Sequence, residues 1–265
     1  AQLKCTIRQY YQLQVLSTER LTPNLQRLVL SGDDLASFPD APAGSYIKLL
    51  FNQFGEPQPT APQEGQRILM RTYTVRALNK AANTLTVDFM LHGEGVEAGP
   101  ASHWAQSAQP GDTIMVAGPG TSKGLAPEHD WVILLGDMTA LPAISAQLEA
   151  LPEQTRGYAI ISIVSEADKQ PLQAPAGIEV IWLVQAGSAG LAKSLLDIEW
   201  LQGEPAVWAA CEFSSMRAIR STLDVEFNVP RTQVYVTSYW REGRSEDQHK
   251  IDKREDAQQY TQLVS

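Results

Sequence analysis

Cysteine and histidine are scarce in this sequence. Its 265 residues include two cysteines, Cys5 and Cys211, and four histidines that lie far apart in the chain. An iron–sulfur cluster needs several thiolates or a mixed cysteine and histidine set, and a protein-held metal needs ligands at a paired spacing. We therefore expect no cluster, no protein-held metal and no disulfide framework, and we expect a reducing, cytoplasmic compartment.

Long apolar runs are missing as well. No segment approaches the roughly 20 apolar residues that a membrane helix needs, and the first residues lack the basic-then-apolar pattern of a signal peptide. The net charge is −9 and the isoelectric point is about 5.0, which disfavours nonspecific nucleic-acid binding. We expect a soluble protein with no membrane or nucleic-acid partner, acting as a monomer.

The first half of the chain does contain a series of short β-type segments. Residues 52–66 form a polar stretch with Pro57, Pro59 and Pro62, which indicates an exposed loop. Glycine and proline separate the other segments, and short strands between such turns are typical of an antiparallel barrel or sandwich. The predicted strands are residues 25–30, 46–51, 70–78, 84–91 and 113–117.

The pattern changes after residue 123. Residues 131–136 are a continuous apolar run, as in a strand buried on both faces. Strands and helices then alternate, which predicts a parallel sheet with crossover helices. We expect strands at residues 158–164, 179–184, 206–210 and 233–237, helices at 142–151, 192–196 and 214–223, and a surface helix within 246–263.

One predicted strand carries a group of side chains suited to a dinucleotide. In Arg71-Thr72-Tyr73-Thr74, side-chain alternation puts Arg71 and Tyr73 on one face and Thr74 on the other. A guanidinium binds pyrophosphate, an aromatic ring packs against an isoalloxazine, and a hydroxyl suits the flavin N5. Taken alone, the same four residues also fit an ordinary strand with an exposed arginine.

Further motifs follow in a fixed order. They are Asp88-Phe89-Met90-Leu91-His92-Gly93, Gly99-Pro100-Ala101-Ser102-His103-Trp104-Ala105, Pro110-Gly111-Asp112, Gly118-Pro119 and Tyr239-Trp240-Arg241-Glu242-Gly243. With them the chain, from about residue 13 to about 250, resembles the siderophore-interacting protein family, the FAD-containing ferric-siderophore reductases among the ferredoxin-reductase-like flavoproteins. The resemblance implies a two-domain β plus α/β fold: an antiparallel Greek-key β-barrel for FAD at 1–123, a Rossmann-like parallel α/β domain for NAD(P)H at 130–245, and a C-terminal helical tail at 246–265.

The resemblance also implies a non-covalent FAD site. Ala101 and Ser102 fall where the family grips the pyrophosphate, at a predicted helix start whose free N–H groups attract an anion. Taken singly, Ser102 fits a helix N-cap, Trp104 a core aromatic and His92 a turn residue; His92 is expected as a contact rather than an acid or base. The full expected set is Arg71, Tyr73, Thr74, Asp88, Phe89, Leu91, His92, Ala101, Ser102, Trp104, Tyr239 and Trp240.

A nucleotide donor is expected at the turn after residues 131–136, where doubly wound folds bind ligands. Thr139 suits a phosphate, although Asp137 would repel one. Glu166 favours the ribose of NADH, while Lys169 keeps NADPH open. Cys211 stands where the family usually has glycine, which puts direct hydride transfer in doubt and leaves a reduced ferredoxin as a second electron source. The expected nicotinamide-binding set is Asp137, Thr139, Ala140, Ser165, Glu166 and Glu212.

The substrate implied is an anionic, aromatic ferric siderophore. Its expected contacts are the cations Lys48, Arg241 and Lys250, with Tyr239 and Trp240 as flat surfaces. The same cations also fit a solvated charged face. We expect Lys48 to lie beside Arg241 or Lys250 at the flavin edge.

These expectations combine into one activity. Electrons pass from NADH, NADPH or a ferredoxin through FAD to chelated Fe(III), and Fe(II) is released. The cofactor supplies the chemistry, so no side chain is expected as a catalytic acid or base. Two alternatives remain: a ferredoxin-reductase-type flavoprotein that passes electrons to a protein acceptor, and a non-catalytic siderophore- or flavin-binding protein.

Overall fold

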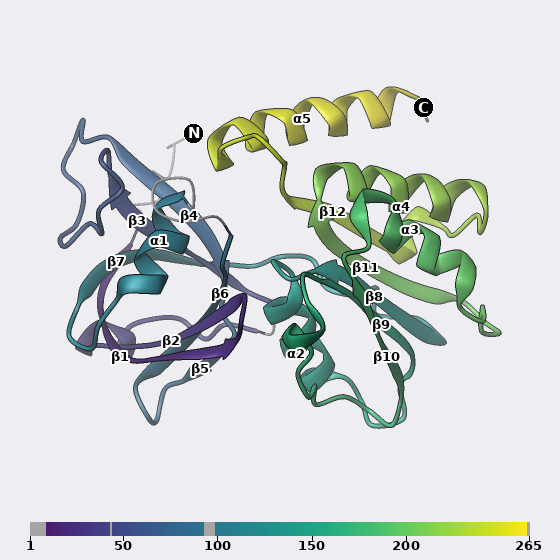
Figure 1. Cartoon of the computed structure of the whole chain (residues 1–265), viewed down its shortest axis with the longest axis horizontal. Helices are drawn as coiled ribbons and strands as arrows, with labels where there is room; N and C mark the ends of the chain where they lie inside the picture. The colour runs from purple at the N-terminus through teal and green to yellow at the C-terminus, as the bar shows by residue number, and fades with distance from the viewer. Residues whose placement is uncertain (1–8, 43, 93–98, 264–265) are drawn as a thin grey trace, which may run out of the picture. The chain divides into compact units, whose positions relative to one another are not determined.

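The computed structural model describes residues 9–42, 44–92 and 99–263 (Figure 1). The chain divides into two compact units, Ala1–Ser122 and Lys123–Ser265. In the described residues, no helix is both long and apolar enough to cross a membrane. The fold class expected from the sequence, an antiparallel β unit followed by a parallel α/β unit, is confirmed.

The first unit is a seven-stranded antiparallel sheet with strand order β4-β3-β7-β1-β2-β6-β5. Every second residue of a strand points to the same face, and the inward residues of β1 and β2 form a buried core with those of β3 and β6. Its elements are β1 (Tyr10–Thr22), β2 (Leu25–Ser31), β3 (Tyr46–Asn52), β4 (Ile68–Thr74), β5 (Ala77–Asn79), β6 (Thr84–Met90), α1 (Gly99–Ser107) and β7 (Thr113–Gly120).

The single strand predicted at residues 70–78 was wrong, because two strands occupy this stretch. β4 ends at Thr74 and β5 begins at Ala77, and the two strands lie at opposite ends of the sheet order. Between them, the Val75 N–H donates to the Ser45 carbonyl beside β3, whereas the Arg76 N–H donates to the Thr86 carbonyl in β6. Because those hydrogen-bond partners lie far away in the chain, the sequence of residues 70–78 itself gives no sign that one strand ends and another begins there.

The second unit is a parallel sheet with strand order β10-β9-β8-β11-β12. The chain runs from β8 outward to β10 and then returns to β11 on the other side of β8, so the order reverses between β8 and β11. The elements are β8 (Trp131–Asp137), α2 (Leu141–Ala150), β9 (Arg156–Ile163), β10 (Gly177–Val184), α3 (Gly187–Asp197), β11 (Pro205–Glu212), α4 (Phe213–Val225), β12 (Val234–Trp240) and α5 (Glu246–Leu263).

Helices cover both faces of this sheet. α3 and α4 share a buried core with β8, β9 and β11, and α2 lies on the other face (Figure 1). The helix predicted at 192–196 is longer than expected and starts at Gly187, because Gly187 and Gly190 are poor helix formers and hid its first turn. The last strand extends to Trp240 rather than residue 237, which brings the motif Tyr239-Trp240 to a strand end.

Candidate functional site

Arg71 and Tyr73 lie on the core-facing side of β4. The register pairs them with Leu49 and Ile47 of β3, both of which are fully buried. Tyr73 packs against the core of the unit but stays partly exposed. Thr74, on the opposite face, is buried. The strand therefore presents a guanidinium and an aromatic ring together, as the alternation predicts.

The Tyr73 ring is supported from behind by other aromatic rings. Its centroid lies 4.5 Å from that of Phe89 in β6, and Phe89 lies 6.1 Å from Trp104 in α1. Trp104 in turn lies 6.3 Å from Phe51 in β3. Phe89 and Trp104 are buried core residues, as is Leu91. They hold the Tyr73 ring in place, and Tyr73 is the member of the group that offers surface to a ligand.

Arg71 keeps an unbalanced charge within the described part of the chain. Its Nη1 donates to the Met70 carbonyl at 2.9 Å, and it forms no ion pair with a described carboxylate. The side chain is half-buried. A partly buried guanidinium without an acidic partner is suited to a phosphate, which it can bind through two parallel hydrogen bonds.

Asp88 has a structural role through its side chain. Its buried carboxylate accepts hydrogen bonds from Arg27 at 2.7 and 2.9 Å, and Arg76 lies at 3.9 Å. A buried charge needs such partners. Because the Asp88 carboxylate is occupied by these arginines, we expect any cofactor contact of Asp88 to come from its main-chain groups.

The main chain at the end of β6 has an open edge. The Leu91 N–H donates to the Asn24 carbonyl, so by alternation the N–H and C=O groups of Asp88 and Met90 point away from β2. On that side, the described pairing with β5 covers only Thr84–Thr86. The groups of Asp88 and Met90 can therefore hydrogen-bond the polar edge of a flat ring such as an isoalloxazine. Together with Arg71 and Tyr73, they fit FAD.

The next motif contributes a buried helix start. Ala101 and Ser102 are almost fully buried in α1, and the Ser102 hydroxyl accepts the His92 N–H at 3.4 Å. His92 itself is exposed, and the surrounding protein lowers the pKa of its imidazole by desolvation. Gly93 of the motif lies outside the described residues.

In the second unit, Asp137 joins three segments at the carboxyl edge of the sheet. Its Oδ1 accepts the Thr139 N–H at 2.9 Å and the Thr139 hydroxyl at 2.5 Å. Its Oδ2 accepts the Glu212 N–H at 2.9 Å and the Trp240 indole N–H at 2.8 Å. Burial nevertheless raises the pKa of this carboxyl above its usual value. The sequence indicated only repulsion of a phosphate, whereas Asp137 binds neighbouring N–H and O–H groups.

The other expected nucleotide residues have local partners. Ser165 accepts the Ala167 N–H and caps a short 3₁₀ turn, and Glu166 pairs with Lys169 at 2.6 Å. The Glu212 carboxylate caps α4 by accepting the N–H groups of Ser214 and Ser215. Ala140 is fully buried beside Thr139.

Cys211 is part of the core. It is fully buried in the cluster shared with α3 and α4, and burial raises the pKa of its thiol well above the usual range. The thiol therefore stays protonated at neutral pH. Its side chain packs inside the second unit and does not protrude from the surface, where its bulk was expected to obstruct a nicotinamide.

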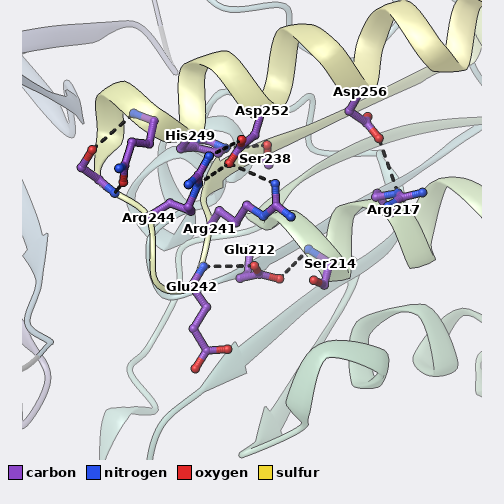
Figure 2. A network of polar contacts seen from close by, with 12 residues as sticks. Glu212, Ser214, Arg217, Ser238, Arg241, Glu242, Arg244, His249, Asp252 and Asp256 are labelled. Carbon is purple, nitrogen blue, oxygen red and sulfur yellow. Dashed lines mark hydrogen bonds and ion pairs between the residues drawn. The ribbon is translucent and has the colours of Figure 1, made fainter.

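The three expected substrate cations have different surroundings. Lys48 of β3 is half-buried, with its Nζ 3.3 Å from the Thr72 hydroxyl. Arg241 pairs with Asp252 at 3.0 Å (Figure 2) and covers the Phe213 ring at 4.4 Å. Lys250 pairs with Glu246 at 3.0 Å. In α5, acidic side chains thus partly neutralise both Arg241 and Lys250.

Several functional candidates had no signal in the sequence. The ion pair of Arg27 with Asp88 joins residues 61 positions apart, and the bond from Trp240 to Asp137 spans 103 positions. The described residues include no group of three or more histidine, cysteine or acidic side chains placed to hold a metal ion.

Two family models match the chain. The model described as siderophore-interacting FAD-binding domain matches residues 14–123, and the one described as siderophore-interacting protein matches residues 129–243. Ferric vibriobactin reductase ViuB of Vibrio cholerae is 35% identical over 240 residues, covering 86% of this chain and 88% of the relative. The NADPH-dependent ferric-chelate reductase of Escherichia coli is 31% identical over 213 residues, covering 74% and 82%.

Solved structures agree with these matches. The siderophore-interacting protein SipS from Aeromonas hydrophila has a TM-score of 0.84 and 32% identity, and the match covers 95% of this chain and 99% of that one. A ferredoxin-NADP+ reductase from Plasmodium falciparum has a TM-score of 0.64 over 88% of this chain and 99% of that one. At 13% identity, the second likeness concerns the fold alone.

Proposed function

This chain belongs to the siderophore-interacting protein family, and from that premise we propose that it reduces the Fe(III) of ferric siderophores. It is an FAD-dependent oxidoreductase. The observation that carries the proposal is the shared face of β4, where Arg71 and Tyr73 stand beside the open main-chain edge of β6.

We assign the parts of the FAD site from these contacts. Arg71 binds the pyrophosphate, and Tyr73 packs against the isoalloxazine. The Thr74 hydroxyl expected near the flavin is buried on the opposite face of β4, so we assign it no contact with the ring. The main-chain groups of Asp88 and Met90 hydrogen-bond its polar edge. When bound, FAD accepts two electrons from a donor and passes electrons singly to ferric iron. The protein positions the cofactor, and no side chain has to transfer a proton.

The donor we propose is a reduced nicotinamide bound at the carboxyl edge of the second unit. Thr139 and Ala140 begin the turn into α2, and we assign the ribose to Glu166, just after β9. Because Glu166 and Lys169 already form one ion pair, the site has little net charge to attract a 2′-phosphate, which favours NADH over NADPH. A reduced ferredoxin remains the second candidate.

For the siderophore we propose Lys48, Arg241 and Lys250 as contacts, with Tyr239 and Trp240 as flat surfaces. Ferric siderophores with catecholate ligands are anionic and aromatic, so cations and rings suit them. One electron converts the bound Fe(III) to Fe(II). The less charged ion is held more weakly by hard oxygen ligands, and it leaves the chelate.

The test is an anaerobic single-turnover experiment. Protein whose flavin has been reduced with dithionite is mixed with a ferric tris-catecholate, and flavin oxidation and Fe(II) capture by a coloured chelator are followed together. We expect both signals to rise at the same rate. Flavin that stays reduced would contradict the proposal and indicate a binding protein, and oxidation by an added ferredoxin alone would indicate a protein acceptor.

A further inference from the structure

Asp88 belongs to two features of the first unit at once. Its main-chain N–H and C=O groups point away from β2 and belong to the open edge of β6 that we assign to the flavin. Its side chain forms an ion-pair group with Arg27 and Arg76. The proposed flavin edge and this ion-pair group thus share one residue.

The Asp88 carboxylate is held from both sides of β6. Arg27 of β2 lies directly opposite in the register and donates two hydrogen bonds, at 2.7 and 2.9 Å. Arg76 comes from the other side of the strand, where its N–H donates to the Thr86 carbonyl and its Nε lies 3.9 Å from the carboxylate. Two parallel hydrogen bonds from one guanidinium fix both position and orientation. The carboxylate therefore keeps two cations beside β6.

The ion-pair group is largely shielded from water. The Asp88 side chain is 3% exposed, and those of Arg27 and Arg76 are 29% and 17% exposed. Partly buried charges are screened less than surface charges, so they act more strongly on a neighbouring group. A buried ion pair adds little stability that well-packed apolar side chains would not give. Its place at a cofactor edge points to a role toward the cofactor.

A flavin gains negative charge when it is reduced. The oxidised ring is neutral, and with two electrons and one proton it becomes an anion above neutral pH. That charge lies on the pyrimidine ring, whose nitrogen and oxygen atoms form the polar edge. Guanidiniums near this edge stabilise the anion, and a carboxylate destabilises it.

We propose that the ion-pair group of Arg27, Asp88 and Arg76 sets the reduction potential of the flavin. Asp88 is its positioning residue, because its carboxylate holds the guanidiniums at the edge where the ring gains charge. The inference rests on the proposed function, since it requires FAD at the main-chain edge of Asp88 and Met90. It extends that function from where the flavin binds to how readily the bound flavin accepts electrons.

The test is the midpoint potential of the bound flavin, measured on the FAD-loaded full chain by equilibration with a reference dye in weakly alkaline buffer. Arg27→Gln removes a positive charge. It should lower the preference for reduced over oxidised FAD about tenfold, which lowers the potential of a two-electron couple by about 30 mV. Asp88→Asn keeps the shape and one acceptor oxygen for Arg27 but removes a negative charge, so the potential should rise by a similar amount.

Two further variants complete the experiment. Arg27→Lys keeps the charge and should have a potential close to that of the parent. Arg20→Gln is the control, because Arg20 is an exposed residue of β1 that donates to Gln26. It removes the same charge from the first unit at a solvated position, and the potential should again stay close to that of the parent.

A structural role alone would not give opposite shifts. If Arg27→Gln and Asp88→Asn move the potential in the same direction, the inference is overturned. Equal potentials in Arg27→Gln and Arg27→Lys also overturn it, even where Asp88→Asn does not retain flavin. The parent protein, reduced with dithionite and mixed with a ferric tris-catecholate, reports the proposed function by itself. Iron reduction by the parent without opposite shifts in the variants would reject the role of the ion-pair group alone.

Discussion

Arginines of the first unit differ in whether an acid neutralises them. Arg27 and Arg76 both approach the buried Asp88, at 2.7 and 3.9 Å. Arg71, on the core-facing side of β4, donates instead to a main-chain carbonyl. A guanidinium bound to a carboxylate has satisfied its strongest partner, whereas Arg71 can still bind an anion. This difference in pairing distinguishes Arg71 from Arg27 and Arg76, and together with its place beside Tyr73 it favours Arg71 for the pyrophosphate.

The first residue-scale prediction concerns cofactor content. Arg71→Ala should lose FAD, because a charge-assisted hydrogen bond contributes about 1.5–3 kcal/mol, or about one to two orders of magnitude in affinity. The measurement is the flavin absorbance of purified protein relative to its protein absorbance. Arg67→Ala, an exposed arginine just before β4, is the control and should keep its flavin. A full flavin complement in Arg71→Ala would remove this residue from the site.

At the scale of single elements, α5 is attached by polar side chains rather than by an apolar face. His249, Asp252 and Asp256 are its buried residues, and their spacing of three and four puts them on one side of the helix. The His249 ring forms a hydrogen bond with the Ser238 hydroxyl at 2.7 Å. The two carboxylates form ion pairs at 2.8 Å, Asp252 with Arg244 and Asp256 with Arg220. Figure 2 shows Asp252 turned toward Arg244 and Arg241, and Asp256 turned toward Arg217. Attachment by charge should depend on pH.

The element-scale prediction follows from Asp252. Hydrogen bonds from Arg244, and then from Arg241, lower its pKa from 3.8 to about 2 despite burial. A carboxyl whose pKa is lower in the folded state stabilises that state above pH ~4 and loses this effect as the pH falls toward ~2. Asp252→Asn should therefore speed amide hydrogen exchange in α5 at pH 6. The difference in exchange rate between this variant and the parent should shrink as the pH falls from ~4 to ~2.

Glu255→Gln is the matched control for that experiment. It removes the same charge from the same helix, but at an exposed position, so the exchange of α5 should stay close to that of the parent at pH 6. Equal acceleration in both variants would mean that the helix responds to its net charge and not to the arginine contacts of Asp252.

The whole molecule carries a net charge of −9, yet the proposed substrate is an anion. Salt screens charges beyond about 8 Å at physiological ionic strength, so nearby cations outweigh the distant excess of acids. In the second unit, Arg241 and Lys250 have acidic partners. In the first unit, Lys48 lies beside the Thr72 hydroxyl and the Tyr46 ring, and it is the cation of that unit that we propose for the substrate.

The prediction at this scale compares two lysines. Lys48→Ala should weaken the binding of a ferric tris-catecholate by up to about fivefold at low salt, because an ion pair in contact with solvent contributes at most about 1 kcal/mol. The loss in affinity should be smaller at high salt. Lys193→Ala, on the surface of α3, makes the same change in net charge and should bind as the parent does. Binding is followed by fluorescence quenching, with FAD content checked in parallel. Similar losses in both variants would show that overall charge, not position, controls binding.

Much of the order and kind of the elements could be read from the sequence, although β1 (Tyr10–Thr22) was not among the predicted strands. The apolar run at residues 131–136 is β8, the alternation of strand and helix after it is a parallel sheet, and Arg71 and Tyr73 share a face as their spacing requires. These features depend on periodicity over a few residues, which is a local property. For the same reason the sequence could not show that residues 70–78 divide between two strands.

The tertiary structure alone decided which charges are compensated and which residues meet at the carboxyl edge of the parallel sheet. Asp88 meets Arg27 across two paired strands, and Trp240 meets Asp137 across a third strand that lies between their own. Both contacts follow from strand order and register, which long-range pairing sets and which no short stretch of residues contains. Local patterns therefore identify the kind of site, and the assembled sheet determines which side chains are left to act in it.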